Sequence, residues 1–339
     1  MATCKNCGKP LILDGGVCVY CRKAQSGMVV SKPPFAPVSS TELHLEIVNG
    51  QVFCTDSSFI KGDLVIPSVV KGEKVVGIAE KAFMKCTDLV SVTIPDTVST
   101  IGNHAFFRCD NLTAVTFGNA LRSIENAAFC NCSKLHSITI PDSVIKIGDE
   151  AFQNCINLTE VKLGDGVKTI GIGAFQQCES LVSVSFSESI RVIGERAFRE
   201  CNSLTSIKIP KSVKEIGKEA FKNCAQLETV ELGHSVRTIG DSAFNSCRSL
   251  MSIRIPNSVR IIGNNAFSDC DSLLYAYIDS SVWKIGTNAF RSPNIRNVVI
   301  SRHDYKKFKE IAGFPHSAVI RHNSFFKGLI AWVKRKLTM

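Results

Sequence analysis

A phenylalanine recurs every 23 residues through most of this 339-residue chain. The ten members of the row are Phe83, Phe106, Phe129, Phe152, Phe175, Phe198, Phe221, Phe244, Phe267 and Phe290. Other apolar residues keep fixed places around each one: Ile five residues before, Ala one before, Cys three after, Leu six after and Val or Ile nine after. A fixed period of this length predicts a chain built from stacked copies of one small unit.

The unit IGDEAFQNCINLTEVKLGDGVKT shows what each copy contains. Its Val-x-Leu segment has the period of two that a short strand requires, and the segment IGxxAFxxC has apolar spacings that suit one turn of helix or an irregular return. A unit this small cannot enclose its own apolar side chains, so the copies must stack and share a continuous core. The pattern therefore predicts a repeat solenoid.

The motif IP-x-x-V-x-x-IG-x-x-AF-x-x-C-x-x-L-x-x-V resembles the BspA-like leucine-rich repeats, over about residues 60–300. The resemblance implies a curved solenoid with a parallel β-sheet on its concave face, short helical or irregular convex segments, and a mostly non-enzymatic role in binding proteins. Departures from the pattern are Glu125 for Gly, Ala276 for Val, and Pro293 for Cys, with one residue missing in the last unit. Five extra residues separate Ile66 from Phe83.

The 15 cysteines fall into separate groups. Nine occupy the repeat slot and are expected to be buried, inert packing residues. Cys4, Cys7, Cys18 and Cys21 form CxxC-x10-CxxC, whose two knuckles predict a tetrahedral site for one structural Zn²⁺ and resemble a short zinc ribbon. A thioredoxin-like redox pair is the alternative, although no βαβ pattern surrounds these cysteines. A closed four-cysteine site leaves no position for a substrate, which argues against zinc catalysis.

Composition shifts divide the chain into six segments. We expect a zinc ribbon at 1–23, a Pro- and Ser-containing flexible linker at 24–40, N-terminal capping strands at 41–77, ten 23-residue repeats at 78–300, a C-terminal cap of one short helix and one strand at 301–323, and a basic amphipathic helix at 324–339.

Charge is concentrated at the two ends. The net charge is +10, of which residues 1–40 carry +4 and residues 301–339 carry +7, leaving −1 on the middle. The final helix would place Phe325, Phe326, Leu329 and Trp332 on an apolar face, with Lys334 and Arg335 on the basic side. It suits packing on the solenoid end, an anionic membrane surface or a partner's groove. No apolar run approaches the length of a membrane span and no signal peptide is evident, so a cytoplasmic location is expected.

Enzyme motifs are missing from the sequence. It contains no GxSxG, HExxH or P-loop, and the three histidines within the repeats occupy different slots. We therefore expect neither catalysis nor a small-molecule substrate.

Function is expected on the outward residues of the repeated strands, which form the predicted concave face. These residues are small and polar in the N-terminal half, whereas the C-terminal third carries Lys208, Glu231, Arg254, Tyr275 and Tyr277. Tyrosine and arginine are enriched at interface hot spots, which predicts that a partner protein docks there, unless the tyrosines pack against the C-terminal cap. The alternatives are a nucleic-acid-associated protein that uses the ribbon and basic tail, or a protein tethered to a membrane surface by its last helix.

Overall fold

The computed structural model describes residues 13–14, 17–18, 44–279, 281–300 and 319–322. The chain divides into two compact units, Met1–Ser39 and Ser40–Met339. In the first unit, β1 (Leu13–Asp14) and β2 (Val17–Cys18) form an antiparallel pair. All other described elements belong to the second unit.

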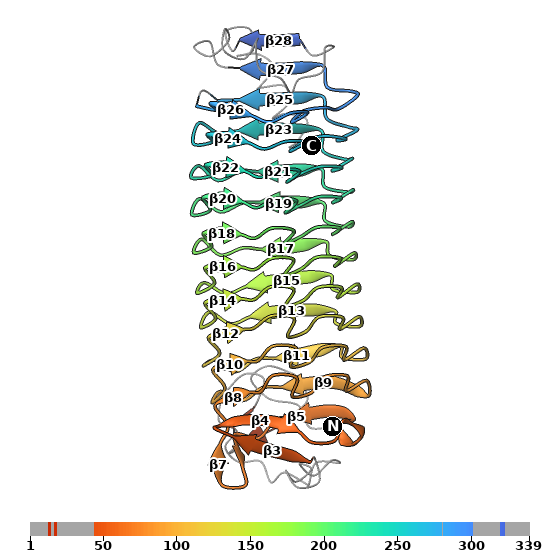
Figure 1. Ribbon diagram of the computed structural model, residues 1–339, viewed down its shortest axis with the longest axis vertical. Helices are drawn as coiled ribbons and strands as arrows, with labels where there is room; N and C mark the ends of the chain where they lie inside the picture. The colour runs from red at the N-terminus through yellow and green to blue at the C-terminus, as the bar shows by residue number, and fades with distance from the viewer. Residues whose placement is uncertain (1–12, 15–16, 19–43, 280, 301–318, 323–339) are drawn as a thin grey trace. The chain divides into compact units, whose positions relative to one another are not determined.

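The second unit is a solenoid in which each repeat forms one turn (Figure 1). One short strand from each turn joins a 12-stranded sheet that runs along the stack and is parallel from β4 onward. Its members are β3 (Leu45–Val48), β4 (Gln51–Cys54), β8 (Gly77–Ile78), β10 (Thr100–Ile101), β12 (Ser123–Ile124), β14 (Lys146–Ile147), β16 (Thr169–Ile170), β18 (Val192–Ile193), β20 (Glu215–Ile216), β22 (Thr238–Ile239), β24 (Ile261–Ile262) and β26 (Lys284–Ile285).

A second strand from each turn lies beside the next in parallel register, in four successive short sheets (Figure 1). We call this set the ladder. Its members are β5 (Gly62–Val65), β9 (Leu89–Thr93), β11 (Ala114–Thr116), β13 (Ser137–Ile140), β15 (Glu160–Leu163), β17 (Ser183–Ser185), β19 (Ser206–Lys208), β21 (Thr229–Glu231), β23 (Ser252–Ile255), β25 (Tyr275–Ile278), β27 (Asn297–Ile300) and β28 (Val319–His322).

The repeated phenylalanines form the centre of the core. Consecutive rings from Phe83 to Phe290 are stacked, with centroids 5.0–5.4 Å apart and planes within 10° of parallel. The repeated Ile, Ala, Leu and Cys side chains are buried around them. The predicted solenoid with a shared core is confirmed.

The ladder strands are the ones that the period of two predicts, whereas the strands of the 12-stranded sheet were not expected. Each is only two residues long, as in Thr100–Ile101, so it is too short to show an alternating pattern. Its backbone bonds to equivalent residues of the adjoining turns, for example Arg122 N to Ser99 O at 2.7 Å. Stacking of turns, and not local propensity, therefore makes this second sheet.

The return segment IGxxAFxxC forms turns and not helix. Within the described residues, the only helix is the 3-10 turn η1 (Ser57–Phe59). In almost every repeat the residues two before and two after the phenylalanine have positive φ, as at Glu150 (56°) and Asn154 (59°). Two left-handed residues within one return are incompatible with an α-helix, so the expectation of short helical segments is wrong and the irregular alternative holds.

The irregular ends of the array follow from insertions and deletions in the sequence. The five extra residues before Phe83 are accommodated by the antiparallel hairpin of β6 (Val69–Val70) and β7 (Glu73–Lys74). At the other end β25 pairs with β27 at a separation of 22 residues, Tyr275 with Asn297, which confirms that one residue is missing there. β28 continues the ladder parallel to β27.

Candidate functional site

The ladder brings the five predicted partner-binding residues onto consecutive strands. Lys208 on β19 pairs in register with Glu231 on β21, and Arg254 on β23 pairs with Tyr277 on β25. The residues between the outward positions, such as Ile207 and Ala276, are buried. Alternation along each strand therefore turns the predicted residues away from the core.

The charged members of this set are partnered within the chain. Lys208 Nζ lies 3.8 Å from Glu231 Oε2, and both side chains are more than two-thirds exposed. Arg254 Nη2 lies 3.1 Å from Oδ2 of Asp279, the residue that follows β25. Asp279 was not among the predicted residues, although it continues the outward alternation of Tyr275 and Tyr277 one residue past the end of the strand.

The two tyrosines form a pair at the end of the row. The ring centroids of Tyr275 and Tyr277 are 6.3 Å apart and their planes meet at 17°. Both side chains are half-buried, and their neighbours on β27 in register are Asn297 and Val299. Partial burial, and secondarily the nearby Tyr275 hydroxyl, raise the pKa of Tyr277. The pair thus presents apolar ring surface together with polar hydroxyl groups.

The residues beside the tyrosines define a surface that we call the tyrosine face: Lys208, Glu231, Arg254, Tyr275, Tyr277 and Asp279. Further along the same rows, toward the N-terminus, the outward residues include an ion pair on β15, Glu160 with Lys162, and are otherwise small, as at Ser91, Ala114, Ser137, Thr93, Thr116 and Thr139. Large amphipathic side chains are therefore concentrated at one end of an otherwise small and polar surface.

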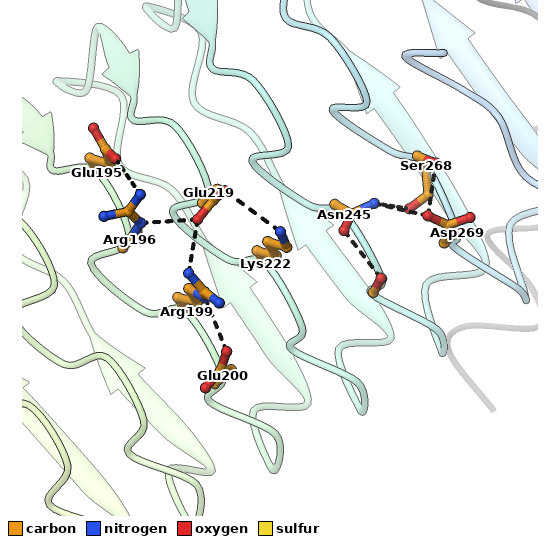
Figure 2. A network of polar contacts seen from close by, with 10 residues as sticks. Glu195, Arg196, Arg199, Glu200, Glu219, Lys222, Asn245, Ser268 and Asp269 are labelled. Atoms are coloured by element: carbon orange, nitrogen blue, oxygen red, sulfur yellow. Dashed lines mark hydrogen bonds and ion pairs between the residues drawn. The ribbon is translucent and has the colours of Figure 1, made fainter.

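A second cluster of charges lies on the return segments, and sequence reasoning missed it. Glu219 Oε2 accepts hydrogen bonds from Arg196 Nε at 3.0 Å and from Arg199 Nη1 at 3.1 Å, while Glu219 Oε1 lies 3.6 Å from Lys222 Nζ (Figure 2). Arg196 and Arg199 also meet Glu195 and Glu200. The sequence contains a signal for this contact, because Arg196 and Glu219 are 23 residues apart and so occupy the same slot of successive repeats. These charges neutralise one another, so the network fits a structural role.

The repeat cysteines do not form a reactive site. Each of the nine is buried, and burial raises the pKa of all of them, to about 12 for Cys178, Cys224 and Cys270. A thiol that keeps its proton is neither a nucleophile nor a metal ligand at neutral pH.

Two groups of predicted residues lie outside what can be described. The side chains of Cys4, Cys7, Cys18 and Cys21, and the whole segment with Phe325, Phe326, Leu329, Trp332, Lys334 and Arg335, are not among the described residues. Within those that are, no three His, Cys, Asp or Glu side chains gather as a metal site. The same part of the chain contains no helix with the length and hydrophobicity to cross a bilayer.

Comparison with known proteins settles the family. The model of the BspA type leucine rich repeat region matches residues 76–205 and 191–312. The chain belongs to this BspA-type leucine-rich repeat family. No curated protein matches it.

Solved structures agree with this assignment. A leucine rich cell surface protein from Faecalibacterium prausnitzii is 29% identical with a TM-score of 0.53, over 75% of this chain and 76% of its own. The T. pallidum leucine rich repeat protein is also 29% identical with a TM-score of 0.51, over 57% of this chain and 91% of its own. BspA-type and other leucine-rich repeat proteins are generally protein-interaction or surface-binding modules and are typically non-enzymatic.

Proposed function

We propose that this BspA-type protein is a non-catalytic scaffold that binds a partner protein through the tyrosine face. The observation that carries the proposal is the tyrosine pair on β25 with Arg254 in register beside it. Tyr and Arg supply most of the energy in many protein interfaces, because each offers a large contact area together with a polar group.

The surroundings of the pair favour this end of the ladder. Lys208 and Glu231 form a solvent-exposed ion pair, which suits the polar rim of an interface. Asp279 holds the guanidinium of Arg254, the register partner of Tyr277, in an ion pair, and a pre-positioned side chain loses less entropy on binding. The small side chains of the N-terminal half offer no comparable anchor.

The test is a comparison of what two matched variants capture from lysate of the protein's own cells, after nuclease treatment. In the first variant Tyr277→Ala is combined with Arg254→Ala. The control, Thr139→Ala with Lys162→Ala, removes ladder residues from the N-terminal half. The proposal expects a defined set of captured proteins to be lost from the first variant and kept by the control.

Melting temperatures distinguish the competing explanation. If the tyrosines serve only to pack against the C-terminal cap, the first variant will melt at a lower temperature while capturing the same proteins. That outcome would refute docking on this face. Partners that disappear with nuclease treatment alone would also refute it, because they would be held through nucleic acid.

We further propose that Cys4, Cys7, Cys18 and Cys21 hold one structural Zn²⁺. The donor set is chemically suitable, and the β1–β2 pair, in which Leu13 lies opposite Cys18, gives the segment between the knuckles the hairpin that a zinc ribbon requires. The protein should contain about one zinc per chain by elemental analysis. Cys7→Ser with Cys21→Ser should abolish the zinc, whereas Cys54→Ser should leave it unchanged; equal zinc in all three would contradict the proposal.

A further inference from the structure

One slot of the repeat is basic in six of the nine turns from Ser99 to Trp283. It lies sixteen residues after the phenylalanine and directly precedes each strand of the 12-stranded sheet from β10 onward. Six of the seven residues in this slot from Arg122 to Arg260 are Lys or Arg, the exception being Ile145. We call the six the basic stripe: Arg122, Lys168, Arg191, Lys214, Arg237 and Arg260.

Backbone hydrogen bonds join the stripe residues from turn to turn. Arg191 N donates to Lys168 O at 3.0 Å, Lys214 N to Arg191 O at 3.1 Å, and Arg237 N to Lys214 O at 2.8 Å. Hydrogen-bonded strands are about 4.8 Å apart, so the six steps between the turns of Arg122 and Arg260 extend the row over roughly 29 Å. The fold thus fixes a periodic row of cations along the stacking direction.

The cations of the stripe are not neutralised by the described part of the chain. All six side chains are exposed, and none forms an ion pair with a described carboxylate. Arg260 Nη1 donates to the carbonyl oxygens of Asn257 at 2.8 Å and Ser258 at 3.1 Å, which orients the guanidinium but leaves its charge. The stripe differs in this from the tyrosine face, where Lys208 and Arg254 have acidic partners.

Charge is separated around the stripe. The surroundings of the stripe are the five positions from two before its slot to two after it, in each of the eight turns from Ala120 to Ile285. These positions contain eight basic residues and one acidic residue, Glu215, for a net charge of +7. Residues 41–300 together carry −1, so everything outside these slots carries −8. A neutral solenoid therefore has one strongly positive strip, which attracts an extended anion along its whole length.

We propose that the basic stripe binds an extended anionic polysaccharide, whose sulfate or carboxylate groups meet successive Lys and Arg side chains. Guanidinium groups bind such oxyanions in two-pronged geometry, and lysines act as point charges between them. This surface is formed by the 12-stranded sheet, so the proposal is independent of protein binding by the ladder.

The geometry disfavours nucleic acid as the occupant. A B-form duplex turns once in about 34 Å, so over a row of roughly 29 Å each phosphate strand winds to the far side of the helix and most stripe residues lose contact. Single-stranded nucleic acid is typically held by aromatic side chains interleaved with the basic ones. The slot contains one described aromatic residue, Trp283, which is 56% exposed and lies beyond the stripe's last member, Arg260.

The test measures binding of the full-length protein to immobilised heparin, a sulfated polysaccharide, as a function of salt. The stripe variant carries Lys168→Gln, Arg191→Gln, Lys214→Gln and Arg237→Gln. The control variant removes the same number of lysines and arginines at exposed positions elsewhere, with Lys61→Gln, Arg108→Gln, Lys134→Gln and Arg248→Gln. Both variants keep the basic C-terminal segment, and their melting temperatures verify the fold.

We expect the stripe variant to bind heparin at least tenfold more weakly than the control at the same ionic strength. The slope of log Kd against log salt should fall by about 3, because the variant loses four contacts and each contact releases a little under one counterion. Equal binding by the two variants would overturn the proposal, because the stripe would then not be the site. Stronger competition by poly-dT or polyglutamate of equal charge than by soluble heparin would overturn the assignment to polysaccharide.

Discussion

The thiol of Cys155 lies 3.3 Å from the carbonyl oxygen of Phe129 in the preceding turn. The same contact joins each of the other repeat cysteines from Cys109 onward to the phenylalanine 26 residues before it, at 3.2–3.3 Å. Each thiol is thus a small buried group that donates a weak hydrogen bond between turns. This relationship explains why one slot of a 23-residue repeat holds cysteine nine times without forming a metal or redox site.

We predict that the repeat cysteines resist alkylation in the folded protein. Burial keeps them protonated and covered, whereas Cys54 is only half-buried. Treatment with iodoacetamide at pH 8, followed by peptide mass spectrometry, should modify Cys54 long before Cys155 or Cys224. In urea all of them should react at similar rates. Modification of a repeat cysteine at the rate of Cys54 in the native state would contradict the packing role.

The same thiols should make the protein less stable in alkali. Burial raises the pKa of Cys224 to about 12 in the folded state, while an unfolded thiol loses its proton above about pH 8.5. The unfolded state therefore binds fewer protons at high pH, and the free energy of unfolding falls as the pH rises above that value. Urea midpoints at pH 7.5 and pH 10 should differ less in the variant Cys201→Ala with Cys224→Ala. An unchanged difference would be evidence against this linkage.

The stack of phenylalanine rings should dominate the stability of the core. Phe175 is fully buried with its ring centroid 5.3 Å from those of Phe152 and Phe198. Phe175→Ala leaves a cavity between two rings and should lower the free energy of unfolding by about 3–5 kcal/mol. Phe175→Leu, which fills part of the cavity, should cost clearly less, and Phe59→Ala at a half-exposed position should cost under about 1.5 kcal/mol. Urea unfolding measures all three; equal losses would contradict the model of a shared aromatic core.

The solenoid and its core could be predicted from the sequence because a strict period fixes which side chains point inward. The phenylalanine row and the ladder alternation both depend on side-chain burial, which leaves a clear apolar pattern. The second sheet depends on backbone bonds between turns, such as Arg122 N to Ser99 O, and backbone bonding leaves little trace in a two-residue strand.

Some of the residues with positive φ in the return segments could also be predicted from the sequence. Asn or Gly stands at many of the positive-φ positions, as at Asn131, Gly173 and Asn223, and these residues tolerate that conformation best.

The charged features were not predicted, for another reason. The Arg196–Glu219 contact and the basic stripe are invisible along the chain and emerge when residues 23 apart are read as neighbours.

We predict opposite effects of the same substitution at two glutamates. Glu150 is exposed with a φ of 56°. In this left-handed conformation a residue with a side chain has a conformational strain of about 1–2 kcal/mol, whereas glycine has none. The larger entropy of glycine in the unfolded state offsets part of this gain, so Glu150→Gly should stabilise the protein by up to about 1 kcal/mol. Glu160 lies in strand β15, and Glu160→Gly should destabilise by about 1 kcal/mol. Thermal unfolding should show the two shifts with opposite signs, and a loss in both would refute the assigned backbone.

Glu219 has a side chain that is only 13% exposed and that contacts three cations, Arg196, Arg199 and Lys222. Burial by itself would raise the pKa of this carboxyl, but the hydrogen bond from Arg196 and the charges of Lys222 and Arg199 outweigh it and lower the pKa. A carboxylate with a lowered folded pKa contributes stability that is present above its unfolded pKa, near 4.3, and is lost as the pH falls through the folded value.

Glu219→Gln should therefore destabilise the protein at pH 7 by about 1–2 kcal/mol, because it replaces the carboxylate that Arg196 and Arg199 share with an uncharged amide. Below about pH 4 the difference from wild type should shrink, since wild-type Glu219 is then increasingly protonated. Glu231→Gln is the matched control, because Glu231 is highly exposed and 3.8 Å from Lys208, and such pairs contribute under about 1 kcal/mol. Urea unfolding of the three proteins at pH 7 and pH 3.5 measures both effects. A pH-independent loss for Glu219→Gln would show that the side chain acts by packing and not by charge.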